Sequence, residues 1–147
     1  MAELTDIADA VVAELNAEDW DLDFTAVRRN LPWFDGPPTD LQVVVVPRGR
    51  EKTLHSRSEN EVVYTIEIGV RRQLTGLKAG QAASNTDTDP LIGLLQDIDD
   101  HFDAAQLAGY TAARWQSTEW AIHDELLREN HLFAATLTVA FRVLKTR

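Results

Sequence analysis

Apolar residues recur along this chain at two spacings, and each spacing predicts a different element. A spacing of three to four residues, typical of an amphipathic helix, runs through residues 3–17 and again through residues 90–105. The first apolar stripe comprises Leu4, Ile7, Ala8, Val11 and Leu15, and the second Leu91, Leu94, Leu95, Ile98, Phe102 and Ala105. We expect the second helix to be capped by Asp89, with Pro90 in its first turn, and to end near residues 108–109.

Alternation of apolar and polar residues predicts strands elsewhere. The predicted strands are residues 21–28, 41–46, 62–72, 112–122 and 132–144, with a helix as the alternative for residues 115–122. The segment 41–46 is apolar at almost every position, which indicates a strand covered on both faces. The segment 62–72 places its apolar side chains on one face, namely Val62, Tyr64, Ile66, Ile68 and Val70. We expect the first three strands to form a meander.

The resulting order, α-β-β-β-α-β-β, indicates an α+β fold with two helices packed against a mainly antiparallel sheet of about five strands. A length of 147 residues suits one domain spanning residues 1–147. No apolar stretch approaches the roughly 20 residues of a membrane helix. The N-terminal residues also lack the basic start and apolar run of a secretory signal. We therefore expect a soluble protein without membrane contact.

The segment between the second and third predicted strands holds most of the candidate binding residues. Residues 48–60 form a charged connection that is longer than a hairpin requires, and such loops are often functional or mobile. The candidate interaction residues here are Arg48, Arg50, Lys52, His55 and Arg57. Trp33 is a further candidate, because it lies beside a Gly-Pro-Pro turn where little core is available to bury it.

Charge is distributed unevenly along the chain. The formal net charge of -10 disfavours nucleic acid as the main partner, because such binding depends on basic side chains that neutralise phosphates. Residues 1–23 contain eight acidic side chains and no lysine or arginine. Basic residues cluster at 28–29, 48–57, 71–72 and 142–147. Two such regions on one subunit suit a head-to-tail contact, and the alternative is that they serve solubility alone.

Residues that could carry catalysis or bind a metal form no complete motif. Cysteine is absent, which excludes thiolate sites. Asn85, Asp87 and Asp89 match the first positions of a calcium loop, but Pro90 stands where glycine is needed. Asp97 and His101 are four residues apart on the second predicted helix. They suit an acid–base pair or a divalent ion, or belong to a solvated helix face.

We therefore expect no enzyme activity, no cofactor and no metal site. One alternative is a small α+β enzyme that acts on an anionic substrate through the Asp97–His101 pair or through the arginines of residues 48–57. Another is a monomeric adaptor that binds one protein through the same basic segment.

The order of these segments resembles that of tail terminator proteins of tailed bacteriophages, and of related neck and tail-completion proteins. The resemblance covers most of the chain. It is carried by the N-terminal helix, Phe24 and Arg28 in a strand, the strand 43–47 that ends in proline, Ser56–Arg57 before the next strand, the helix 90–105 and the segment 127–133.

The resemblance implies a structural virion protein of the tail or neck, assembled in the host cytoplasm. Such a subunit forms a ring, typically of six copies, that caps the tail tube and offers a surface to head-completion or connector proteins. DNA would pass through the lumen without specific binding, and no catalysis is implied. Residues 48–60 would become ordered on assembly. Another neck or head-closure subunit is the alternative within this class.

Overall fold

A computed structural model of the chain describes residues 3–30, 41–74, 77, 84–104, 114–123, 126–127 and 131–146, and for 103–104 and 114–119 it describes the backbone alone. Its elements are α1 (Glu3–Ala17), β1 (Ala26–Arg28), β2 (Gln42–Leu54), β3 (Glu59–Gln73), α2 (Asn85–Ala104), β4 (Arg114–Ile122) and β5 (Leu132–Thr146). The order α-β-β-β-α-β-β and the α+β class are those predicted from the sequence.

The strands form one five-stranded sheet in the order β1-β2-β3-β5-β4. The pairs β2–β3, β3–β5 and β4–β5 are antiparallel. β1 pairs with β2 in parallel, so the predicted meander of the first three strands is wrong. β1 is also much shorter than the predicted strand 21–28. Asp21 and Asp23 precede it, and aspartate is disfavoured in strands.

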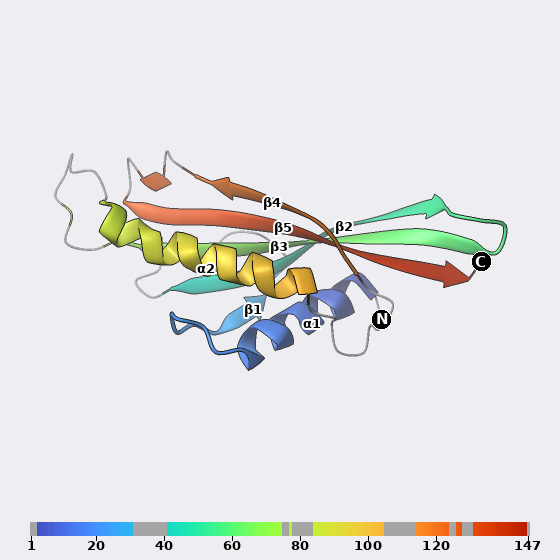
Figure 1. Cartoon of the computed structure of the whole chain (residues 1–147), viewed down its shortest axis with the longest axis horizontal. Helices are drawn as coiled ribbons and strands as arrows, with labels where there is room; N and C mark the ends of the chain where they lie inside the picture. Colours follow the sequence, from blue (N-terminus) through green and yellow to red (C-terminus); the bar gives the residue numbers. More distant parts are fainter. Residues whose placement is uncertain are drawn as a thin grey trace.

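Both helices pack against the same face of the sheet (Figure 1). The core joins the apolar stripes of the helices to the apolar faces of β3 and β5. The stripe of α1 is buried at Ile7, Ala8, Val11 and Leu15, and that of α2 at Leu91, Leu94, Leu95, Ile98 and Phe102. All four valines of residues 43–46 are buried, as expected of a strand covered on both faces. The helical and strand periodicities in the sequence thus identify the core correctly.

α2 begins earlier than the sequence pattern predicts. Ser84 and Asp87 form a reciprocal cap, in which the Ser84 backbone N–H donates to the Asp87 carboxylate at 3.2 Å and the Ser84 hydroxyl donates to it at 2.9 Å. The predicted cap at Asp89 is therefore wrong, and Pro90 lies inside the helix. The predicted helix end near residues 108–109 and Ala105 lie outside the described residues.

The predicted loop 48–60 is also wrong, because most of it is strand. β2 continues to Leu54 and β3 begins at Glu59, so only residues 55–58 form the turn. The backbone N–H groups of His55 and Ser56 close this turn by donating to Glu59 O at 3.1 and 3.0 Å. The hairpin and the end of β5 together extend beyond the helices as a three-stranded ribbon (Figure 1). We call residues 48–63 and 142–146 the arm.

Candidate functional site

A β-bulge at Arg48 determines which way the basic side chains of the arm point. Pro47 pairs with Ile66 and Gly49 with Thr65, so Arg48 is an extra residue in β2. Because side chains alternate along a strand, one extra residue moves all later side chains to the other face. Without the bulge, Arg50 and Lys52 would point away from the helices. With it, they lie on the helix side of the sheet, where they pair with Tyr64 and Val62.

Tyr64 lies at the base of the arm, on the helix side of the sheet. Its side chain is fully buried, and the Arg50 guanidinium lies over its ring at 5.7 Å from the centroid. Arg50 Nε also donates to the Tyr64 hydroxyl at 3.4 Å. The base of the arm therefore positions Arg50 through an aromatic ring that is itself fixed in the core.

Lys145 ties the arm to the helices. It donates to, and forms an ion pair with, the carboxylate of Glu3 in the first turn of α1. This hydrogen bond raises the pKa of Lys145 above the ordinary lysine value, against the opposing effect of burial, and Tyr64 contributes further in the same direction. The arm is thus held against the N-terminal end of α1 by a charged contact.

The tip of the arm, residues 52–57, presents an apolar residue among cations. The Leu54 side chain is 67% exposed, although it is large and hydrophobic. Lys52, His55 and Arg57 are exposed around it, and Lys52 has no polar partner among the described residues. His55 Nδ1 lies 4.0 Å from Glu61. An exposed leucine flanked by cations is a combination that favours docking on a partly apolar, acidic surface.

The cations on the reverse face of the arm are paired within the chain. Arg48 Nε lies 3.1 Å from Glu67, and Arg142 Nη1 lies 4.0 Å from Glu61. Arg48 was predicted as an interaction residue, but this pair already engages it. Of the other predicted residues, Arg50, Lys52, His55 and Arg57 do lie together on the arm. Trp33 lies outside the described residues.

Sequence reasoning missed two important side chains of the arm. Leu54 was assigned to a loop, and Lys145 was noted only as part of a C-terminal basic cluster. The alternation of side chains along residues 132–144 indicates the position of Lys145. When it is continued by one residue, it places residue 145 on the same face as Phe141 and Val143.

The helices form an acidic layer beside the arm. α1 and α2 contain no lysine or arginine, while acidic side chains are exposed along both helices and along the segment that follows α1. These exposed acids are Asp9, Glu18, Asp19, Asp21, Asp23, Asp87, Asp89, Asp97 and Asp100. Asp9 is paired with Arg28 at 2.7 Å, but most of the others have no cationic partner among the described residues. One subunit therefore carries a basic arm and an acidic helical layer.

His101 does not pair with Asp97, so the two residues do not form the acid–base or metal site considered as an alternative. Its Nε2 lies 2.9 Å from Glu14 and its Nδ1 lies 3.9 Å from Glu18, both of which belong to or follow α1. The ring also meets Trp20 edge to face at 5.5 Å. His101 thus joins the two helices, whereas Asp97 is exposed without a polar partner in the described part of the chain.

No group of three or more potential metal ligands occurs among the described residues. Of the residues that match the first positions of a calcium loop, Asp87 is engaged in the cap of α2, and Asp89 lies within the helix. The described helices include none that is long and apolar enough to cross a membrane.

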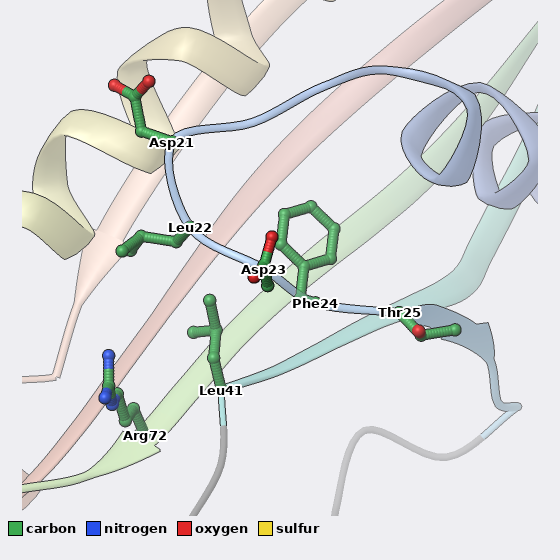
Figure 2. Close-up of a pocket in the computed structure, with 7 residues that line it drawn as sticks. All are labelled: Asp21, Leu22, Asp23, Phe24, Thr25, Leu41 and Arg72. Atoms are coloured by element: carbon green, nitrogen blue, oxygen red, sulfur yellow. The ribbon is translucent and has the colours of Figure 1, made fainter.

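An open hollow of about 640 Å³ lies beside the start of β2 and the end of β3, at the end of these strands opposite to the arm's tip (Figure 2). It is lined by Asp21, Leu22, Asp23, Phe24, Thr25, Leu41 and Arg72. A second hollow of about 300 Å³ shares Leu22 and Arg72 with it and continues toward the first turns of α2. Neither hollow contains histidine, so neither brings together the residues proposed for acid–base chemistry.

No protein-family model matches the sequence, and no significant match is found among curated proteins.

Proposed function

We propose that this protein is a structural subunit that assembles head to tail into a ring, and that the ring is a tail terminator of a tailed bacteriophage or a related tail-like particle. The observation that carries this proposal is the presence of a basic arm and an acidic helical layer on the same subunit. A head-to-tail contact joins two different patches of each copy, and it closes into a ring when its rotation permits. Opposite charges on the two patches favour this contact over a symmetric one.

The form of the arm supports this proposal. Three paired strands, the Arg50–Tyr64 contact and the Lys145–Glu3 pair define its position before any partner binds. A preformed arm loses less conformational entropy on binding than a flexible loop does. We therefore replace the expected ordering of residues 48–60 with docking of an arm that is already folded.

The element order supports the more specific role. The order α-β-β-β-α-β-β is the one on which the resemblance to tail terminators rests. In this proposal the ring, typically of six copies, caps the tail tube and contacts a head-completion or connector protein. The net charge of -10 suits a lumen through which DNA passes without binding. Its location is then the neck or tail of the virion.

Charge reversal at the arm tests the assembly. Wild type, Lys52→Glu and Arg29→Glu are compared by sedimentation velocity at low salt. Arg29 is an exposed cation outside the arm, so both substitutions change the net charge equally. We expect wild type and Arg29→Glu to form the same oligomer and Lys52→Glu to shift toward monomer. Equal assembly of all three proteins would contradict a role for the arm.

The terminator role needs a test of its own. Purified tail tube protein from the same source is allowed to polymerise with and without this protein. We expect added protein to stop extension and to appear at one end of each tube. Continued extension, together with binding to the connector alone, would assign the chain to another neck subunit.

A further inference from the structure

The hollow beside Arg72 combines apolar and acidic groups. Leu22, Phe24 and Leu41 are half-buried and pack on the core, so their outer surfaces face the hollow (Figure 2). Asp21 and Asp23 are exposed and have no polar partner among the described residues. Arg72 is the one cation that lines it, and it too lacks a described partner. The hollow therefore offers an apolar floor with two unpaired carboxylates and one unpaired guanidinium.

The tip of the arm carries the complementary groups. Leu54 is the most exposed of the large hydrophobic residues described, at 67%. Lys52 and Arg57 lie on either side of it in the sequence and are exposed. The apolar and cationic groups of the tip thus each have a counterpart in the hollow, Leu54 in its apolar floor and the two cations in Asp21 and Asp23.

A single copy cannot make this contact with itself. Leu41, which lines the hollow, directly precedes β2, and Leu54 ends that strand. At about 3.3 Å per residue, the strand separates the two sites by roughly 40 Å. Figure 1 shows the start and the end of β2 at opposite parts of the sheet. An arm tip that enters this hollow therefore belongs to a second copy.

We propose that the tip of the arm of one subunit docks in the hollow lined by residues 21–25, Leu41 and Arg72 of the next subunit. Leu54 enters between Leu22, Phe24 and Leu41, while Lys52 and Arg57 pair with Asp21 and Asp23. This inference rests on the proposed head-to-tail assembly and identifies the two surfaces that form it. The contact is heterologous, because the tip and the hollow are different patches of the same chain.

Two charge-reversed proteins test the docking. One carries Lys52→Glu and Arg57→Glu at the tip, and the other carries Asp21→Lys and Asp23→Lys in the hollow. Alone, each protein places like charges on both sides of the contact, so we expect at least a tenfold loss of assembly. An equimolar mixture restores opposite charges at every contact and should assemble with the two proteins in equal amounts. Folding of each variant is checked by circular dichroism and thermal melting.

Cross-linking provides an independent test, because the chain contains no cysteine. A Leu54→Cys/Thr25→Cys variant is oxidised and run on a denaturing gel, with Leu54→Cys/Asp100→Cys as the control. Thr25 lines the hollow, whereas Asp100 is exposed on α2 outside it. We expect disulfide-linked ladders for the first variant and little cross-linking for the control.

The outcomes separate this inference from the function on which it rests. Wild-type rings without a Leu54–Thr25 cross-link, or a mixture of reversed variants that fails to assemble, would overturn the docking and leave the ring proposal standing. If the wild-type protein forms no rings and the Leu54→Cys/Thr25→Cys variant forms no cross-links, both proposals are overturned.

Discussion

At the scale of single residues, the tie between the arm and the helices depends on Lys145 and Glu3. Both side chains are partly exposed, at 37% and 29%, so the pair is screened by water. Its stabilising effect is therefore small, at most about 1 kcal/mol. Its position matters more than its strength, because it joins the arm to α1 at the point where the arm leaves the body of the molecule.

Replacement of Lys145 by methionine should reveal this pair through its pH dependence. The raised pKa of Lys145 means that its contribution is fully present below the lysine pKa of the unfolded chain and is lost as pH rises through the folded value. We expect wild type to melt at a slightly higher temperature than Lys145→Met at pH 8, with the difference disappearing in the alkaline range above the ordinary lysine pKa.

Thermal melts of both proteins between pH 8 and pH 12 measure the effect. Glu3→Gln serves as the matched control, since it removes the other half of the pair and should abolish the same pH dependence. A difference between wild type and Lys145→Met that is constant across the series would show that the ion pair contributes nothing.

Asn16 holds the end of α1 onto the first strand. Its side-chain amide donates to Ala26 O at 3.1 Å, and its side-chain carbonyl accepts from Ala26 N at 2.8 Å. Asn16→Ala leaves both backbone groups of buried Ala26 without these partners, so we expect a loss of about 1–3 kcal/mol in the free energy of unfolding. Urea denaturation measures it, with exposed Asp19→Ala as control. Equal stability of the two variants would contradict this role.

At the scale of elements, the bulge in β2 is the feature that gives the arm its basic face. Deletion of Arg48 removes the extra residue and leaves Gly49 paired with Thr65 and Arg50 with Tyr64. Deletion of Glu51, which lies in a regular part of the ladder, instead moves Lys52 and the following residues to the opposite face.

We therefore expect the Arg48 deletion to assemble like wild type and the Glu51 deletion to lose assembly. Sedimentation velocity compares the two proteins, and thermal melts verify that both fold. Loss of assembly in both deletions at equal stability would show that the register of the arm does not control the contact.

The helices, β3 and β5 were predictable from the sequence because each has one buried face and therefore shows a regular apolar period. The first half of β2 was predictable from its continuous apolar run, because it is buried on both faces. The arm could not be predicted from the sequence, and the reason is physical. Its outer part is exposed on both faces, so residues 48–54 show no apolar alternation and look like a charged loop. The sequence pattern predicts the start of α2 too late because Pro90 suits the first helical position, whereas the Ser84–Asp87 cap begins the helix more than a turn earlier.

At the scale of the whole molecule, two surfaces of opposite charge lie at opposite ends of the sheet. The basic tip lies at one end of β2, and the hollow that carries Asp21 and Asp23 lies at the other. Sequence alone showed the charge segregation, but not this arrangement, because the position of the hollow depends on how the segment after α1 packs beside Arg72. It likewise could not show that His101 contacts Glu14 of α1, since these residues lie 87 positions apart in the chain.

The central claim is that this protein closes into rings through charged, head-to-tail contacts. Negative-stain electron microscopy of the concentrated protein, at low and at moderate salt, tests it most directly. We expect closed rings with a central hole at low salt and fewer rings at moderate salt, because the screening length falls to about 10 Å at 0.1 M. A uniform field of monomers at both salt concentrations, unchanged by added tail tube, would contradict the account.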